Sequence, residues 1–365
     1  MKSEKNKKII FLVNSLEGGG AERIVLTLSE GFIGRGYEVH LILLYNRISF
    51  PIAPEINLFI LNKNSNLNLL TKGFGFFVLA SKLKSYLRTI DYDPDEDIFT
   101  SHLPFSNFVS WAARVKNHYA VVHGALSFKY KSFLTRFFLK LIFKNKRMIG
   151  VSQGVKNDLI NYFSLSEINV GYIYNPFQID KIQRLAEEST DTSLGNYLIH
   201  ISRFIKLKRH DLLLKAFKES RLYKSNKLLL LGEGPERENI QNLAIDLGIE
   251  DYVIFKNWQD NPYAWIKNAK LLVLCSDHEG LPTVLIESLI CHTPVVSTDC
   301  RYGPDEILVG DLAKFLVPVN SPDQLANSMV KAVADYPVIS SRYYDKFQVN
   351  HVLDHYLMLN KKFNS

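Results

Sequence analysis

Apolar and polar residues are distributed along this chain in blocks that predict short buried strands, each followed by an amphipathic helix. The strands appear as apolar runs of strand length that end in Gly, Pro, Asn, Ser or His. They lie at 9–15, 119–123, 170–174, 197–202, 228–231 and 271–276. Helices are predicted at 21–34 and around Leu212–Phe217, where apolar residues recur at helical spacing. This alternation is typical of parallel sheets with helices on both faces, so the predicted class is α/β.

The length of 365 residues exceeds one ordinary domain and favours two. The natural break follows Asn175–Pro176, and a polar stretch at 187–196 precedes the next strand. The predicted domains are therefore 1–177 and 178–345. The remaining residues, 346–365, belong to a terminal helix predicted over about 340–361.

The segment D-H-E-G-L-P-T-V-L-I-E-S-L at 277–289 follows a buried strand and leads into a helix that Pro282 is expected to open. Glu279 precedes this helix start, and Glu287 lies about two turns into the helix. Free N–H groups at a helix start attract anions. Here they belong to Leu281, Thr283 and Val284. The pattern indicates a site for a phosphorylated sugar, although two exposed carboxylates on a surface helix would give the same spacing.

Two cations, Arg203 and Lys208, follow the strand 197–202 in I-S-R-F-I-K-L-K-R-H-D. Ligands in open α/β sheets bind at the carboxyl ends of strands. The cations are therefore placed to neutralise a diphosphate leaving group. The alternative is a solvated basic loop.

Other strand ends carry weaker signals. A Gly-rich turn at Gly232 follows the strand 228–231, and Trp258 would either stack on a base or pack in the core. Near the amino terminus, Gly18, Gly19 and Gly20 precede a helix, with Arg23 where a dinucleotide fingerprint requires its last Gly. This spacing argues against a dinucleotide site.

Together these segments resemble the retaining GT-B glycosyltransferases of family 4. The E-x7-E pattern with Gly280, the G-R-x-x-x-x-K-G signature and the G-G-A-E loop carry the resemblance. Ser202 and Arg209 depart from the signature's two glycines, and Arg209 would either weaken loop closure or add a phosphate contact. The resemblance implies a GT-B fold, with two Rossmann-like parallel-sheet domains facing across a cleft.

The resemblance also implies the site residues. Arg203 and Lys208 would stabilise the diphosphate, Glu279 the donor sugar, and Glu287 the ribose. His123, at a strand end, would reach the reaction centre, so that the catalytic set is Glu279, His123, Arg203 and Lys208. Donor binding would involve Gly19, Gly20, Arg203, Lys208, Gly232, Trp258, Glu279, Gly280, Leu281, Thr283, Val284 and Glu287. His102 is the candidate on the acceptor side.

The implied activity is that of a retaining hexosyl- or N-acetylhexosaminyl-transferase. It would move a sugar from a nucleotide-sugar, most simply a UDP-sugar, to a glycan or lipid-linked sugar acceptor in bacterial surface polysaccharide biosynthesis. No cofactor and no metal are expected, because no D-x-D pair stands near these motifs; D-Y-D at 91–93 lies in an acidic run. The alternatives are a UDP-sugar epimerase or hydrolase on the same fold, and a non-catalytic sugar-nucleotide-binding protein.

Charge is uneven along the chain. Residues 1–177 hold 22 Lys and Arg against 13 Asp and Glu, whereas the remainder holds 22 against 24. Much of the excess lies at 129–147, which has no acid and a wide aromatic and aliphatic face. This composition is typical of a helix on an anionic membrane surface. The alternative is a core-facing helix with a basic outer side. A nucleic-acid partner is not expected, since no nucleic-acid module is recognisable.

Three cysteines without C-x-x-C spacing favour a reducing compartment over a disulfide framework or a zinc site. Neither a transmembrane run nor a signal peptide is apparent. The expected location is the cytoplasm, peripheral to the inner face of the cytoplasmic membrane.

Overall fold

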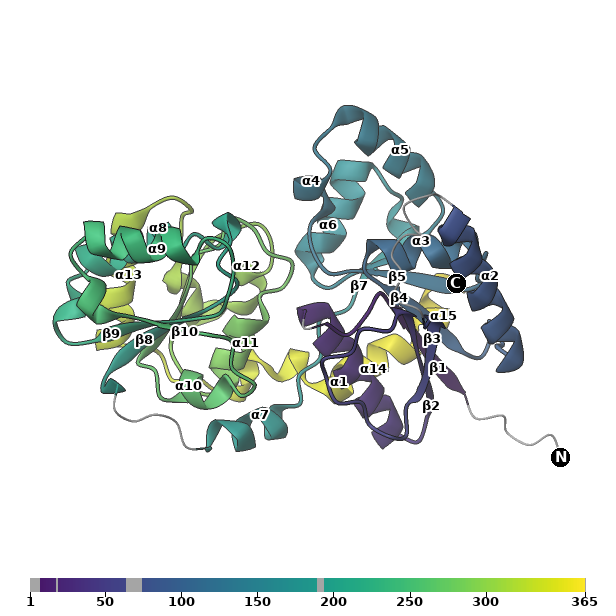
Figure 1. Ribbon diagram of the computed structural model, residues 1–365, viewed down its shortest axis with the longest axis horizontal. Coiled ribbons are helices and arrows are strands. Elements are labelled where there is room, and N and C mark those ends of the chain that lie inside the picture. Colours follow the sequence, from purple (N-terminus) through teal and green to yellow (C-terminus); the bar gives the residue numbers. More distant parts are fainter. Residues whose placement is uncertain (1–6, 18, 64–73, 189–193, 365) are drawn as a thin grey trace. The chain divides into compact units, whose positions relative to one another are not determined.

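The computed structural model describes residues 7–17, 19–63, 74–188 and 194–364. The chain divides into two compact units, which are described separately. Unit 1 consists of Met1–Phe177 and Phe347–Ser365, and unit 2 consists of Gln178–Lys346. Each unit is built on one parallel sheet with helices (Figure 1). This confirms the predicted α/β class and its two parallel-sheet domains.

Unit 1 contains a seven-stranded parallel sheet in the order β3-β2-β1-β4-β5-β6-β7. The strands are β1 Lys8–Val13, β2 Glu38–Tyr45, β3 Asn57–Asn62, β4 Ile98–His102, β5 His118–Val122, β6 Arg147–Gly150 and β7 Val170–Tyr172. The helices are α1 Gly20–Gly34, α2 Phe74–Thr89, α3 Pro104–Ala112, α4 Leu126–Lys129, α5 Phe133–Phe143, α6 Gln153–Phe163, α14 Val349–Leu357 and α15 Leu359–Asn364. In β1 every residue is buried, because successive side chains meet helices on opposite faces of the sheet. Ile10 and Leu12 pack in a cluster with α2 and α3, whereas Phe11 contacts Phe32 of α1.

Unit 2 contains a six-stranded parallel sheet in the order β10-β9-β8-β11-β12-β13. The strands are β8 Tyr197–Ile201, β9 Lys227–Leu231, β10 Val253–Lys256, β11 Leu271–Leu274, β12 Val295–Thr298 and β13 Leu316–Val317. The helices are α7 Ile179–Ala186, α8 His210–Glu219, α9 Arg237–Asp246, α10 Tyr263–Lys267, α11 Thr283–Ile290, α12 Pro304–Ile307 and α13 Pro322–Ala334. Leu198, Leu228, Leu230 and Val273 of the sheet pack with residues of α8, α9 and α13 in one hydrophobic cluster.

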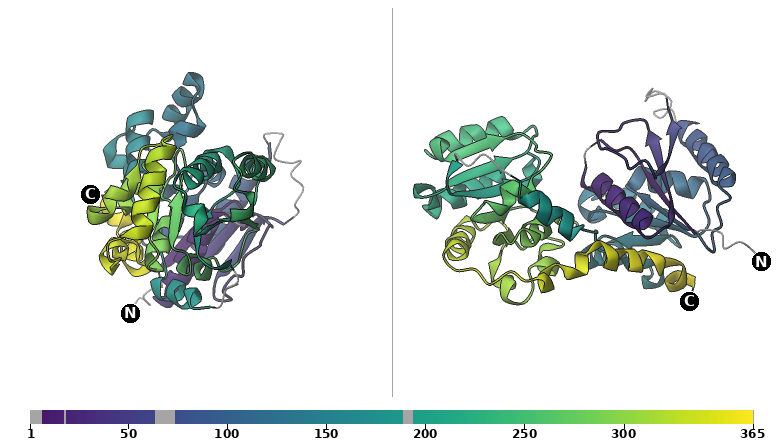
Figure 2. Two further views of the ribbon diagram at one scale, coloured as in Figure 1. Left: turned by 90° about the vertical axis from the view of Figure 1, so that its left-hand side faces the viewer. Right: turned by 90° about the horizontal axis from the view of Figure 1, so that it is seen from below.

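The carboxyl-terminal residues return to unit 1 after two 3-10 turns, Ser341–Tyr343 and Asp345–Phe347. Backbone hydrogen bonds of 2.8 and 2.9 Å join Phe177 to Phe347 and to Val349. From there α14 packs against α1 (Figure 2). The prediction of one continuous helix over 340–361 is therefore wrong, because two 3-10 turns and an extended residue at Gln348 precede α14.

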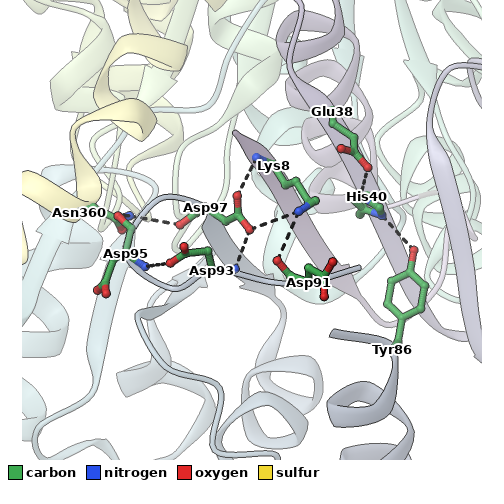
Figure 3. Close-up of polar contacts among 9 residues, drawn as sticks. All are labelled: Lys8, Glu38, His40, Tyr86, Asp91, Asp93, Asp95, Asp97 and Asn360. Carbon is green, nitrogen blue, oxygen red and sulfur yellow. Dashed lines mark hydrogen bonds and ion pairs between the residues drawn. The ribbon is translucent and has the colours of Figure 1, made fainter. Parts of the chain in front are cut away.

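The last helix is held by buried polar contacts at the amino-terminal ends of β1 and β4 (Figure 3). Asn360 donates from Nδ2 to the carbonyl oxygens of Asp95 and Asp97, and its Oδ1 accepts from the Tyr119 hydroxyl at 2.8 Å. The Asp97 carboxylate in turn accepts from the backbone N–H of Lys8 at 2.9 Å. A buried amide with all of these partners fixes the position of α15 on unit 1.

Candidate functional site

The strand order of unit 2 reverses between β8 and β11, because β9 and β10 follow β8 on one side and β12 and β13 follow β11 on the other. Such a reversal separates the loops that leave the two central strands, and ligands of open α/β sheets bind there. The loop after β8 carries Arg203 and Lys208, and the loop after β11 carries Glu279. The strongest sequence signals therefore share one edge of one sheet.

Lys208 and Glu279 meet at this edge. Lys208 Nζ donates to Glu279 Oε1 at 2.5 Å, and the side chains are 18% and 13% exposed. Ser276 Oγ donates to the same oxygen at 2.5 Å. The Asp277 N–H donates to the Leu207 carbonyl at 3.0 Å and joins the two loops. A carboxylate and an ammonium are thus held together, largely shielded from water, at the place where a phosphorylated ligand would enter.

Arg203 has a different environment. Its side chain is exposed and takes part in none of the ion pairs formed by the described residues. A guanidinium in a loop at a strand end remains available for bidentate contact with phosphate oxygens. The two predicted diphosphate ligands therefore differ, since Lys208 is paired with an acid, whereas Arg203 forms no ion pair with the residues that the structure describes.

Arg209, which departs from the glycine of the signature, lies in the left-handed conformation at φ 49° and ψ 44°. Its guanidinium forms ion pairs with Asp211 at 3.0 Å and Asp277 at 2.8 Å, and also contacts Asn320. These hydrogen bonds raise the pKa of Arg209 further above its usual value. Of the two roles predicted for Arg209, a phosphate contact is disfavoured because acids already occupy its donors, and the loop is tied rather than weakened.

Helix α11 begins at Thr283, and Pro282 is its N-cap residue with φ −71° and ψ 97°. The prediction that Pro282 is the first helical residue is therefore wrong by one position. The first backbone hydrogen bond of this turn runs from Leu285 to the Pro282 carbonyl at 3.2 Å, so the N–H groups of Thr283 and Val284 lie ahead of it. Gly280 and Leu281 are buried beside this start, and the half-buried Glu287 lies on its second turn.

The turn after β9 contains glycines because its backbone lies very close to the backbone of the loop after β8. Gly232 has φ 147°, and a Cβ there would lie 2.0 Å from the Ser202 carbonyl oxygen; at Gly234 it would lie 2.4 Å from the Phe204 oxygen. Gly232 therefore has a structural role beside its predicted contact with the donor. Trp258, after β10, is 42% exposed, which excludes the alternative of a core tryptophan and leaves base stacking as a prediction.

In unit 1 the strand order reverses between β1 and β4. Gly19 is the N-cap of α1, and Gly20 is its first residue; Gly18 lies outside the described residues. Ser106 Oγ at the start of α3 donates to Asn14 Oδ1 after β1 at 2.7 Å, across the reversal. The predicted Gly-rich loop and this polar pair therefore share the carboxyl edge of the sheet.

His102 is the last residue of β4, and His123 directly follows β5. The two strands are neighbours in the sheet. His102 Nδ1 lies 2.9 Å from His123 Nε2, and His102 Nε2 lies 3.2 Å from Thr100 Oγ1. His102 is fully buried, whereas His123 is half-buried. Burial lowers the pKa of His123 to about 4 and, with the neighbouring imidazoles of His123 and His118, holds the pKa of His102 well below its usual value. The structure thus brings the two predicted histidines together, with His102 behind His123; direct acceptor binding by His102 stays a prediction.

Sequence reasoning missed the polar residues that support these groups: Ser276, Thr100, Asn14 and Ser106. It also missed His118, whose Nε2 lies 2.6 Å from Ser101 Oγ. The available signal was the presence of Thr and Ser inside the fully buried strand β4, I-F-T-S-H. Buried polar groups require partners, so such residues mark internal networks.

Among the residues that the structure describes, no group of three or more His, Cys, Asp or Glu is arranged to hold a metal ion. In the D-Y-D run the backbone carbonyl of Asp91 accepts from Lys8 Nζ, and the carboxylate of Asp93 accepts from the Asp95 N–H (Figure 3). This run therefore stabilises the turn before β4.

Helix α5 exposes its apolar face. Six large apolar side chains are between 41% and 77% exposed: Phe133, Leu134, Phe137, Phe138, Leu141 and Ile142. Only Leu139 and Phe143 of this helix are buried. The alternative of a helix whose wide apolar face packs in the core is therefore wrong. Within the described ranges, none of the helices is long and apolar enough to cross a membrane.

Two family models match this chain, each over a little less than half of it and together over nearly its whole length. "Glycosyltransferase Family 4" matches residues 18–181, and "Glycosyl transferases group 1" matches residues 183–347. The first covers the unit with the histidine pair, and the second covers the unit with the Lys208–Glu279 pair.

Curated relatives and solved structures agree with these matches. The 4-alpha-N-acetylgalactosaminyltransferase of Campylobacter jejuni that acts on N-acetylgalactosamine-N,N'-diacetylbacillosaminyl-diphospho-undecaprenol is 29% identical, over 90% of this chain and 91% of its own. The lipopolysaccharide 1,6-galactosyltransferase of Escherichia coli is 28% identical, over 54% of this chain and 59% of its own. Among solved structures, TarM superposes with a TM-score of 0.76 at 16% identity over 100% of both chains. HepE of Anabaena, in complex with UDP and glucose, gives 0.72 at 18% identity over 96% of this chain and 98% of its own.

Proposed function

The chain belongs to the GT-B glycosyltransferases of the family 4 type, and from this premise we propose that it transfers a hexose or N-acetylhexosamine from a UDP-sugar with retention of configuration. The observation that carries the proposal is the ion pair between Lys208 and Glu279 at the strand reversal of unit 2, beside the start of α11. Together with the exposed Arg203, these groups supply the charges that a nucleotide-sugar requires. Solved relatives described as complexes with UDP support the nucleotide.

Each group has a role in this reaction. The bond between the anomeric carbon and the diphosphate oxygen breaks, and its electron pair leaves on the diphosphate, where Arg203 and Lys208 stabilise the charge. Glu279 contacts the sugar hydroxyls and steadies the positive charge that develops at the anomeric carbon. Glu287 holds the ribose. The acceptor oxygen forms its bond on the same face, and its proton passes to the departing phosphate, so that retention requires no protein nucleophile.

The proposed acceptor is a glycan or lipid-linked sugar in the synthesis of a bacterial surface polysaccharide. Support comes from relatives whose acceptors, as named, are a diphospho-undecaprenol glycan and lipopolysaccharide. The basic helix α5 agrees with an acceptor carried at a membrane.

The proposed location is the membrane surface, with α5 as the contact. Its exposed apolar face would enter the interface, while Lys129, Lys131, Lys140 and Lys144, all exposed, would contact anionic lipid headgroups. Each such cation contributes about 1 kcal/mol near an anionic surface and acts within a Debye length.

The donor is tested by screening UDP-sugars for protection against thermal unfolding, because a ligand at 100 times its Kd adds about 2.7 kcal/mol of stability. Product analysis with the donor that binds then separates the alternatives. Transfer only in the presence of acceptor is expected. Free sugar and UDP formed at the full rate without acceptor would identify an epimerase or hydrolase, and a bound donor that is never consumed would identify a binding protein. Arg203→Ala and Lys208→Ala should each slow transfer by roughly 100-fold.

The membrane contact is tested by co-sedimentation with vesicles that contain anionic lipid, at low and high salt. Wild-type protein should bind more weakly in salt, and the combined changes Lys129→Glu, Lys131→Glu, Lys140→Glu and Lys144→Glu should release it. The matched control reverses four exposed lysines of unit 2, Lys215, Lys224, Lys270 and Lys331, and should leave binding nearly unchanged. Transfer to a lipid-linked acceptor should slow only in the first variant, and transfer to a soluble acceptor in neither. Wild-type protein that stays in the supernatant at low salt would refute the membrane contact.

A further inference from the structure

His123 is held from behind by a short chain of buried polar groups. Thr100 Oγ1 lies 3.2 Å from His102 Nε2, and His102 Nδ1 lies 2.9 Å from His123 Nε2. Thr100 and His102 are both fully buried. The His102 ring also packs against Phe11, with ring centroids 5.8 Å apart, which limits its rotation. The chain runs from the interior of β4 to the end of β5.

The direction of the hydrogen bonds in this chain follows from counting donors. Both imidazoles are neutral near pH 7, because burial lowers the pKa of each. A neutral imidazole carries one N–H, so the bond between the rings has two arrangements. Either His102 Nδ1–H donates to His123 Nε2, or His123 Nε2–H donates to His102 Nδ1.

Thr100 distinguishes the two arrangements. In the first, the bare Nε2 of His102 accepts the Thr100 hydroxyl proton, so the two fully buried donors, this hydroxyl and His102 Nδ1–H, both have acceptors, and the N–H of the half-buried His123 lies at Nδ1. In the second, His102 Nε2–H occupies the Thr100 oxygen, and the hydroxyl proton needs another acceptor. Among the described residues, His102 Nε2 is the only hydrogen-bond partner of this hydroxyl. A buried donor without an acceptor costs about 1–3 kcal/mol, so the first arrangement is favoured.

We propose that His102 is a positioning residue which, with Thr100, fixes His123 as the Nδ1–H tautomer. The nitrogen that a histidine uses outward is set by the hydrogen bond that its other nitrogen makes. Among the described residues His123 Nδ1 has no hydrogen-bond partner, and the side chain is half-buried, so this nitrogen is left for a ligand.

The consequence is chemical. With Nδ1 protonated, His123 donates a hydrogen bond to a substrate oxygen and does not act as a general base. This inference rests on the proposed function only for the identity of that substrate. It agrees with a transfer in which the leaving phosphate accepts the acceptor's proton.

The direct test reads the tautomer by nitrogen NMR of the full chain labelled at histidine, with His123→Gln used to assign the signals. Wild-type protein should show His123 with a protonated Nδ1 and a bare Nε2. In His102→Leu this preference should be lost, and in His102→Asn, whose amide N–H lies near the place of Nδ1, it should be largely kept. The matched control is His118→Leu, which removes another buried histidine of unit 1 that does not contact His123. His123 with a protonated Nε2 in wild type, or an unchanged tautomer in folded His102→Leu, would overturn the proposal.

Kinetics supply a second readout. His102→Leu should lower kcat for transfer roughly tenfold, within the range observed for outer partners of functional imidazoles. The same change in a His123→Ala background should have little further effect, because positioning needs a residue to position. If the effects of His102→Leu and His123→Ala on kcat were fully additive, His102 would have a general packing role, and the proposal would again be overturned.

The two proposals fail separately. If His123→Ala transfers sugar at the wild-type rate, the role of His123 in the reaction is wrong, while the tautomer measurement still decides on His102. If the tautomer is the opposite one, the inference on His102 fails, while glycosyl transfer and its donor site stand.

Discussion

Replacing Glu279 by Gln should separate nucleotide binding from sugar transfer. In the structure, Lys208 is neutralised by Glu279 at 2.5 Å, so a diphosphate that binds Lys208 must compete with this carboxylate. Gln keeps the size of the side chain and its hydrogen bonding but removes the charge. We therefore expect UDP, which lacks the sugar, to bind the variant more tightly than wild type. Transfer should fall, because the sugar loses its carboxylate.

The magnitude depends on the environment of the pair. Two unit charges about 4 Å apart interact by about 4 kcal/mol at an effective dielectric constant of 20. Both side chains keep some exposure, 18% and 13%, and a hydrogen bond between charged groups has a net value of about 1.5–3 kcal/mol. If about half of the lower value, about 1.5 kcal/mol, becomes available to the incoming diphosphate, the affinity for UDP rises severalfold. If all of this 1.5 kcal/mol becomes available, the affinity rises about tenfold. Loss of the contact in the transition state should slow transfer by roughly 100-fold.

The assay is titration calorimetry of UDP with wild type and Glu279→Gln, with transfer rates measured on the same preparations. Asp277→Asn is the matched control, because it removes a carboxylate two residues away that pairs with Arg209 and not with Lys208. Its UDP affinity should stay close to wild type. If Glu279→Gln binds UDP no more tightly than wild type, the Lys208–Glu279 pair does not oppose diphosphate binding. If Asp277→Asn shows an equal rise in UDP affinity, the change in net charge alone explains the effect.

Three further outcomes are expected. Arg209→Gly should leave unit 2 more stable to urea than Arg209→Ala by about 1 kcal/mol, because both lose the ion pairs but only Gly relieves the left-handed backbone at φ 49°; equal stabilities would contradict this. Stability should fall as pH drops from about 6.5 to about 4, by about 1.4 kcal/mol per pH unit for each buried histidine with a depressed pKa, because the unfolded chain takes up protons that the folded one does not; urea midpoints that are flat across this window would refute it. Transfer should persist in EDTA, because in the proposed reaction Arg203, Lys208 and the start of α11 would stabilise the leaving group without a metal; loss with EDTA that manganese or magnesium restores would show that a metal takes part.

The strands, and the site residues that follow them, were predictable because strands buried on both faces appear in the sequence as continuous apolar runs. The runs at 9–15, 197–202 and 271–276 become β1, β8 and β11, each ending one or two residues earlier than predicted. The residues that come directly after such a run lie at the carboxyl edge of a parallel sheet. Arg203, Lys208 and Glu279 could therefore be assigned to one edge without knowing their distances.

The contacts between these residues were not predictable, since they depend on strand order. Lys208 and Glu279 are separated by 71 positions, and they meet because β8 and β11 are neighbours. The apolar pattern is the same for every order of the strands. His102 and His123 likewise meet because β4 pairs with β5, and Thr100 is drawn into their chain by the alternation of side chains along β4.

The error at Pro282 is explained by contacts with another segment of unit 2. Proline suits the first helical position, but here the chain is still extended at ψ 97°. Contacts from another loop hold it so: the Glu279 N–H donates to the Arg301 carbonyl at 2.7 Å, and a Cβ at Gly303 would lie 2.7 Å from Pro282 Cδ. The loop after β12 therefore fixes the residues that precede α11, and it is remote in sequence.

Arg209 shows what a departure from a family pattern can reveal. The pattern has Gly there, and the backbone at φ 49° gives the reason, since this conformation costs other residues about 1–2 kcal/mol. Arg209 occupies it while forming ion pairs with Asp211, on the following helix, and with Asp277, in the loop that holds Glu279. These ion pairs offset the backbone cost and fasten the Lys208 loop to the Glu279 loop. The substitution therefore replaces glycine by a charged connection between the loop that holds Lys208 and the loop that holds Glu279, the two residues to which the proposed function assigns the diphosphate and the sugar.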